Sequence, residues 1–279
     1  NMGYTYSLSA LFEKSFYFGL DLAASYTFGH SKSVYDGTSS VAYSNWKYNY
    51  AVDSNNPGLA YSMFDIPHRV MVSVGYRTPR YAKGFMATTV SLVYNGYVGQ
   101  RYSLTMNESY YDAEKKKTVY IDYNGDGWGG NSLLYIPTED ELQKMDFKTE
   151  EDRRKFDEWI EGDSYAKKHR GAYAMRNSNS APWENRVDLH VAQDIFVLKD
   201  RGSKFQVTFD VTNFANMLNK KWGTTYTAAY NVMPLQVIGS KKGEDGNYTN
   251  TYAYNSRNTI TKNDVLSRWH AQIGFKYIF

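Results

Sequence analysis

The chain lacks cysteine altogether, which excludes a disulfide framework and any metal site built on thiolates. It also lacks any apolar run of about 18 residues, so a transmembrane helix is excluded. Its mean hydropathy is correspondingly low, at −0.61. Neither sign of charge dominates, because 32 Lys and Arg stand against 29 Asp and Glu. The charges are spread too widely to form the basic stripe of a nucleic-acid-binding protein.

Aromatic residues are abundant. The sequence has 27 Tyr, 14 Phe and 6 Trp, together 17% of the chain, and such residues form girdles at both surfaces of a membrane barrel. The segment 267–279 alternates apolar and polar side chains, with one break at Ile278. Successive side chains of a strand point to opposite faces, so one face of this segment is apolar and the other polar. A strand of this length fits a barrel that crosses the bilayer in about 9–11 residues per strand.

The same alternation recurs upstream and predicts seven strands in all. We expect them near residues 3–13, 16–29, 67–77, 84–103, 184–198, 204–215 and 266–279. Short turns at 13–15, 78–84 and 199–203 alternate with long loops at 30–65, 104–183 and 216–265. This asymmetry is typical of outer-membrane barrels. The predicted fold class is therefore all-β: a transmembrane antiparallel β-barrel with long extracellular loops, one of which contains short helices.

A C-terminus in the periplasm fixes the direction of every strand. The last strand then runs toward the periplasm, all three long loops lie outside the cell, and the short turns lie on the periplasmic side. A soluble β-sandwich is the alternative, since its strands also alternate. Loops this long are uncommon in compact domains, however, and sandwich strands are shorter.

Seven strands do not close a membrane barrel. Bacterial single-chain barrels have even strand numbers, and an open sheet edge in lipid leaves backbone groups without partners. We therefore expect residues 1–279 to be the C-terminal part of a single barrel domain. The N-terminal barrel strands, a plug and the export signal would lie outside this sequence.

The loop 104–183 is predicted to be organised. Thr138 with Glu141 forms a capping-box pattern, and Thr149 with Asp152 forms a weaker one. We expect one or two short amphipathic helices between residues 138 and 168. The apolar stripe of these helices would anchor the loop on the barrel rim; the alternative is contact with a ligand or a surface partner. The stripe consists of Phe156, Trp159 and Ile160.

The same loop contains the start of a calcium-binding loop. Asp122, Asn124 and Asp126 alternate and are followed by Gly127, so three oxygen-bearing side chains surround one point and the glycine permits a sharp turn. These three residues, with the carbonyl of Trp128, are the candidate metal ligands. The alternative is an Asn/Asp/Gly-rich turn that holds no metal.

The twelfth position of this loop departs from the calcium pattern. It is Leu133 rather than glutamate, so the usual bidentate ligand is missing. Asn131, or a carboxylate from elsewhere such as Asp140 or Glu141, would have to replace it. We predict calcium as the cofactor of this loop and no other cofactor.

Two further motifs carry a resemblance to known proteins. The ending Gln272–Phe279 is similar to the C-terminal signal read by the barrel-assembly machinery of the outer membrane. The segment Asp210–Gly223 resembles the penultimate strand and following loop of TonB-dependent receptors, particularly the Oar-like group of Bacteroidetes type with a carboxypeptidase-regulatory-like domain. Further similar segments are 64–69, 122–137, 170–177 and 181–188. The resemblance implies a barrel of twenty-two strands, of which these would be the last seven.

The resemblance also implies a function and partners. Receptors of this family bind a scarce extracellular ligand and import it with energy relayed by the TonB–ExbB–ExbD complex, through a plug and a TonB-binding segment near the N-terminus. A surface lipoprotein is a further partner for the glycan importers among them. The alternative is a passive porin or a surface-structural barrel. The tyrosines, tryptophans and polar tips of the three long loops are the candidate ligand contacts, and no single substrate residue stands out.

We do not expect an enzyme. His190 and His270 lie on the predicted polar face, with Asp188 and Asp194 near the first of them, but no activated nucleophile accompanies them. Polar residues on this face are what any water-filled barrel needs.

Overall fold

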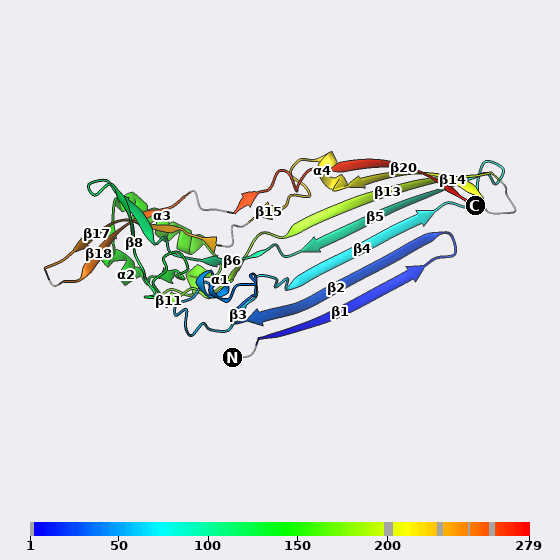
Figure 1. Cartoon of the computed structure of the whole chain (residues 1–279). Coiled ribbons are helices and arrows are strands. Elements are labelled where there is room, and N and C mark those ends of the chain that lie inside the picture. Colours follow the sequence, from blue (N-terminus) through cyan, green and yellow to red (C-terminus); the bar gives the residue numbers. More distant parts are fainter. Residues whose placement is uncertain (1–2, 198–202, 228–230, 245, 257–259) are drawn as a thin grey trace.

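The computed structural model describes residues 3–197, 203–227, 231–244, 246–256 and 260–279. Its main feature is one curved antiparallel sheet, in which seven long strands follow one another in sequence order (Figure 1). A two-residue strand, β3 (Ala60–Tyr61), pairs with the end of the second long strand. The long strands are β1 (Tyr4–Ser15), β2 (Leu20–Ser33), β4 (His68–Arg77), β5 (Met86–Tyr97), β13 (Glu184–Phe196), β14 (Lys204–Thr212) and β20 (His270–Ile278).

The connections between these strands differ at the two ends of the sheet (Figure 1). The β1–β2 and β4–β5 connections, residues 16–19 and 78–85, are short turns at one end. The connections 34–67, 98–183 and 213–269 are long and all lie at the other end. The C-terminus lies at the short-turn end, so the parity expected from the sequence is present in the sheet.

The registers keep apolar and polar side chains on separate faces. Phe209 pairs with Val191 on one side and Ile273 on the other, and Phe209 and Ile273 remain 40% and 63% exposed. On the opposite face, Asp194 is fully buried among three donors from β4 and β14. It accepts hydrogen bonds from the Arg77 guanidinium (2.6 Å), the Lys204 ammonium (2.7 Å) and the Gln206 amide (2.8 Å). One face of the sheet is therefore apolar and exposed, as a lipid-facing wall requires.

The first turn lies later than the sequence pattern predicted. We expected it at 13–15, but Glu13 and Lys14 still pair with β2, and the turn occupies residues 16–19. Gly19 adopts φ +94° and lies directly against the carbonyl of Arg77. A side chain at this position would collide with that carbonyl. The position of the turn is therefore determined by Gly19 and not by Glu13 and Lys14.

Three other strands are shorter than predicted. The expected strand 84–103 stops at Tyr97, because Gly99 approaches the backbone of Pro182 and the chain then continues as a separate short strand. The expected strand 204–215 stops at Thr212, because Asn213 takes a left-handed conformation with φ 57°. The expected strand 266–279 begins at His270. The predicted turn 199–203 falls almost wholly outside the described residues.

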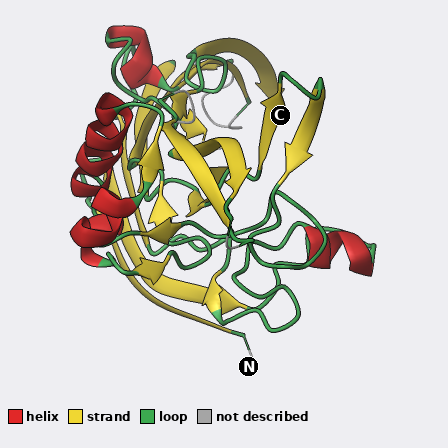
Figure 2. Ribbon diagram, turned by 90° about the vertical axis from the view of Figure 1, so that its left-hand side faces the viewer, coloured by secondary structure: helices red, strands yellow, loops and turns green. Residues whose placement is uncertain are grey.

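The long connections form a second unit, which we call the loop body and define as the described residues of 34–67, 98–183 and 231–256. Segments from different connections pair within it: β10 with β18 and β16 with β6, both in parallel. Viewed from this end, its strands lie centrally and its helices at the periphery (Figure 2).

The short helices and strands at this end of the sheet come from all three long connections. They are α1 (Ala42–Lys47), β6 (Arg101–Leu104), β7 (Ser109–Asp112), β8 (Lys117–Tyr120), β9 (Tyr135–Ile136), α2 (Glu139–Lys144), β10 (Asp146–Phe147), α3 (Glu150–Gly162), the 3₁₀ turn η1 (Ala166–Lys168), β11 (Ala172–Tyr173), β12 (Asn179–Ser180), α4 (Phe214–Leu218), β15 (Tyr226–Thr227), β16 (Asn231–Val232), β17 (Leu235–Lys242), β18 (Tyr248–Tyr254) and β19 (Thr261–Lys262).

The predicted helix starts are confirmed. Thr138 and Glu141 form a reciprocal capping box at the start of α2, and the Thr149 hydroxyl accepts from the backbone N–H of Asp152 at the start of α3. Helices are not confined to one loop, however, because α1 and α4 lie in the other two connections. No helix of the described residues is both long and apolar enough to cross a membrane.

The loop body has its own hydrophobic core. The apolar stripe of α3 lies in this core, where Phe156 and Ile160 are fully buried and the Phe156 ring lies 6.2 Å from that of Phe147. The expectation that this stripe anchors the loop on the barrel rim is therefore wrong: it packs between loops. The buried members are Tyr102, Leu104, Met106, Leu134, Ile136, Leu142, Phe156, Ile160, Ala166, Ala174, Val232 and Leu235.

Phe156→Ala tests whether this core holds the loop body together. We expect the loop body to lose about 3–5 kcal/mol of stability, the usual cost of removing a buried phenyl ring, while the sheet stays folded. Limited proteolysis of the full protein should then cleave residues 98–183 much faster, with unchanged heat-modifiable migration on gels. Glu158→Ala, on the exposed face of α3, is the control. Equal cleavage rates for both variants would contradict a shared core.

Candidate functional site

The predicted calcium loop is a compact turn of the loop body. The Asp122 carboxylate accepts from the backbone N–H of Asp126 (3.1 Å) and of Gly127 (2.7 Å). The Trp128 N–H donates to Asp126 Oδ1 at 2.7 Å. The structure thus brings Asp122, Asn124 and Asp126 together in one turn, as the spacing predicted.

A second set of donors reaches the same turn from another connection. Asp126 Oδ2 accepts from the Ser54 hydroxyl (2.6 Å) and from the amide nitrogens of Asn131 (2.7 Å) and Asn124 (3.3 Å). Burial alone would raise the pKa of Asp126, but these donors outweigh it and hold the pKa below its ordinary value. Asn131 also donates to the Lys47 carbonyl, so the turn joins two connections of the loop body.

The substitutes considered for the missing glutamate behave differently. Glu141 accepts from the backbone N–H and hydroxyl of Thr138 and from the Tyr135 hydroxyl, in the cap of α2. Asn131 lies in the turn, but its amide nitrogen faces Asp126. Within the described ranges, no three His, Asp or Glu side chains are grouped as a metal site would require. Calcium binding stays a prediction of the sequence.

We predict that calcium added to the chelator-treated full protein binds this turn and raises the melting temperature of the loop body. Asp122→Asn should weaken binding, because it removes a charged oxygen ligand that a hard cation prefers. Glu158→Gln, an exposed change on α3, is the control for loss of one charge. Isothermal titration calorimetry measures the effect. The same unfolding curve in calcium and in chelator would leave the turn as a hydrogen-bonded joint only.

Next to this turn lies a buried carboxylate that the sequence did not single out. Glu108 is 4% exposed; its Oε2 accepts from the Gly130 N–H, and its Oε1 has no partner among the described residues. The hydroxyl of Ser132 is also buried and unpaired there. Burial raises the pKa of Glu108 above its ordinary value, against the opposing effect of the Gly130 N–H.

Glu108→Gln should therefore stabilise the loop body near pH 7. A carboxyl whose folded pKa is raised weakens the fold once the pH exceeds its unfolded value near 4.3, and glutamine removes that loss. Replacing the unpaired oxygen of a charged carboxylate by a neutral amide nitrogen is worth about 1 kcal/mol near pH 7, or about 2–4 °C in melting temperature for a unit of this size. The gain should vanish near pH 4. Thermal unfolding at both pH values measures it, with the exposed Glu114→Gln as control; a gain independent of pH would contradict this account.

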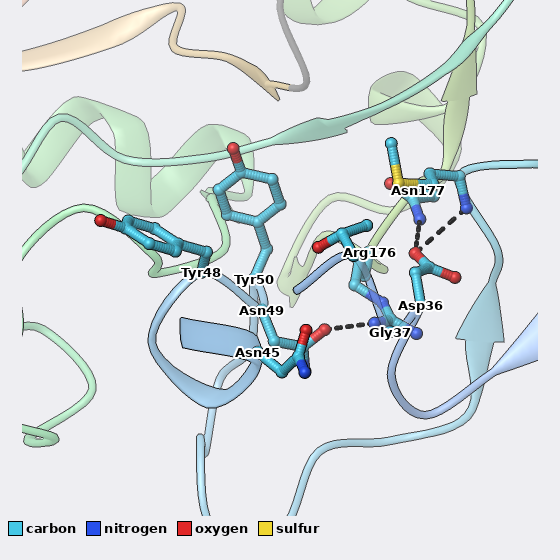
Figure 3. Close-up of a pocket in the computed structure, with 10 residues that line it drawn as sticks. Asp36, Gly37, Asn45, Tyr48, Asn49, Tyr50, Arg176 and Asn177 are labelled. Atoms are coloured by element: carbon cyan, nitrogen blue, oxygen red, sulfur yellow. Dashed lines mark hydrogen bonds between the residues drawn. The ribbon is translucent and has the colours of Figure 1, made fainter. Parts of the chain in front are cut away.

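A cavity of about 320 Å³ lies where residues 36–50 meet residues 176–177 (Figure 3). The Arg176 guanidinium lines it and is 5% exposed. Nη1 donates to the Asn49 side-chain oxygen, and Nη2 donates to the carbonyl and, at 3.3 Å, the hydroxyl of Ser33. Burial lowers the pKa of Arg176, and the nearby Asp36 opposes this effect.

Asp36 lines the same cavity but has other partners. Its carboxylate accepts from the Ser33 hydroxyl (2.7 Å), the Met63 N–H (3.1 Å) and the Asn177 amide (3.4 Å). Figure 3 shows Asp36 beside Asn177 and Arg176 beside Asn49. Arg176 lies in the segment 170–177 that carries part of the resemblance, but its burial was not predictable, because an arginine in a polar loop is normally solvated.

A second cavity, of about 220 Å³, lies between all three connections. Its tyrosines are Tyr123, Tyr135, Tyr173 and Tyr252. They belong to the long loops whose tyrosines are the candidate ligand contacts, and contact with a ligand stays a prediction.

The junction of the sheet with the loop body is held by a buried ion pair. Arg101 donates to Asp65 through Nε (3.0 Å) and Nη2 (2.6 Å), and the Asp65 side chain is fully buried. Asp65 also accepts from the Ser31 N–H at 2.6 Å. This arrangement explains the Phe64–Arg69 motif structurally: its aspartate joins β2 to β6.

The two histidines of the polar face lie on different strands of the sheet. His190 contacts Asp210 across the β13–β14 pair at 2.5 Å, rather than Asp188 or Asp194. Asp188 instead pairs with Arg186. His270 lies on β20, beyond β14.

An antiparallel sheet that exposes one apolar face and carries its long connections at one end has the build of a membrane-barrel wall. A family model described as outer membrane beta barrel domain matches residues 3–268. The chain belongs to this family, which places the protein in the bacterial outer membrane. No curated protein and no solved structure matches the chain.

Proposed function

We propose that the chain supplies barrel wall and external loops to a TonB-dependent receptor that imports an extracellular ligand with energy. The observation that carries this proposal is the loop body. The second and third connections, far apart in the sequence, share one hydrophobic core, and the first connection helps to line two cavities beside them. A folded surface of this kind suits selective binding of a ligand.

The orientation and the partners are part of the proposal. With the C-terminus in the periplasm, the loop body lies outside the cell. The strands β1 and β20 form the edges of the sheet, and edges in lipid need partners. Further strands of the same barrel would supply them, up to the twenty-two of the resembling receptors. A plug inside this barrel would meet TonB–ExbB–ExbD, and the barrel-assembly machinery would insert the product. The role is transport rather than catalysis.

A conductance measurement separates energised transport from passive diffusion. We predict that the full protein, reconstituted in planar lipid bilayers, passes no steady ion current, because a plug fills its lumen. It should also bind the purified periplasmic domain of TonB. A barrel that is always open, with stable channel steps and no binding to TonB, would favour the passive porin instead.

A further inference from the structure

The cavity beside Arg176 holds a buried cation that is paired with neutral groups alone. Its guanidinium donates to an amide oxygen, a carbonyl and a hydroxyl. No carboxylate of the described residues forms an ion pair with it, and Asp36 acts on it only through space. A buried charge without a counter-charge is costly, so an anionic group placed here would gain a strong partner.

The second observation is an unused donor in the same cavity. Asn49 is 8% exposed and lines the cavity, and its amide nitrogen has no acceptor among the described residues. Its side-chain oxygen is already held by Arg176. A buried amide nitrogen without an acceptor costs free energy. The cavity therefore contains two groups that would bind acceptor oxygens of a ligand: the Arg176 guanidinium and the Asn49 amide nitrogen.

The charges of the cavity limit the kind of anion that fits. A planar carboxylate matches the fork of a guanidinium, with two parallel hydrogen bonds. Asp36 in the same wall disfavours a multiply charged anion such as phosphate, because like charges repel. The volume of about 320 Å³ lies at the small end of ligand sites.

We propose that this cavity binds the carboxylate of a small ligand, with Arg176 and the Asn49 amide nitrogen as donors. Two sources carry this chemistry: an acidic sugar, or the C-terminal residue of a peptide. The inference rests on the proposed function, since it names the group by which an imported ligand is recognised. Ser33, the last residue of β2, holds Arg176, so the cavity sits where the loop body joins the barrel wall.

Matched pairs of probes test the proposal on the full protein in detergent. Galacturonate is compared with galactose, and N-acetylalanine with N-acetylalanine amide, by isothermal titration calorimetry. A charge-assisted pair of hydrogen bonds should make at least one carboxylate bind about tenfold or more tightly than its neutral counterpart. Which carboxylate binds distinguishes the two sources. Equal binding within both pairs, or no binding of either carboxylate, would overturn the proposal.

Asn49→Asp tests the site without removing the arginine. The new carboxylate takes the contact that Asn49 already makes with Arg176 and supplies an internal counter-charge, so the loop body should stay folded. Binding of the carboxylate probe should fall about tenfold or more. Asn55→Asp makes the same charge change on an exposed residue of the same connection and should leave binding unchanged. Unaltered binding to Asn49→Asp would place the probe elsewhere. Because this assay needs no energy source and no channel, its failure would leave the conductance result standing.

Discussion

Every backbone N–H and C=O of a strand in hydrocarbon needs a partner within the protein, because lipid offers none. The continuous antiparallel ladder from β1 to β20 meets this need for the inner strands. The rest of the architecture depends on it. Adjacent strands run in opposite directions, so successive connections fall alternately at the two ends of the sheet. The three long connections must therefore emerge side by side, although they are far apart in the sequence.

This convergence explains why the loop body can have a core. Most of this core belongs to the second connection, and Val232 and Leu235 of the last connection complete it. α3 illustrates the arrangement: its Phe156 packs against Phe147 of the same connection, whose ring in turn lies 6.2 Å from Tyr252 of the last connection. Cavities then arise at the joints between connections rather than within one of them.

The sequence predicts the parts of the fold that depend on local periodicity. Alternation identifies the strands and their faces, and the Thr138 capping box identifies the start of a helix. Strand ends are less predictable, because they depend on single close approaches such as that of Gly19 to Arg77. Periodicity also does not indicate what an apolar stripe packs against. The sequence therefore predicts the barrel rim for the α3 stripe, whereas the structure places it in the core of the loop body. The burial of Arg176 is not predictable from the sequence, since it results from packing between two connections.

Two buried arginines of this chain, Arg101 and Arg176, differ in the partners of their guanidinium groups. Arg101 is paired with the buried carboxylate of Asp65, and this pair fixes the sheet to the loop body. Arg176 also has a carboxylate in its cavity wall, yet Asp36 is held by Ser33, Met63 and Asn177. Each arginine thus has an aspartate nearby, but only Arg101 forms an ion pair with it. A permanent ion pair suits a structural joint, whereas a cation held by neutral acceptors can still exchange a weak partner for a stronger one. Because Arg101 has a permanent carboxylate partner and Arg176 has none among the described residues, Arg101 acts as a structural residue, and we assign the proposed ligand binding to Arg176.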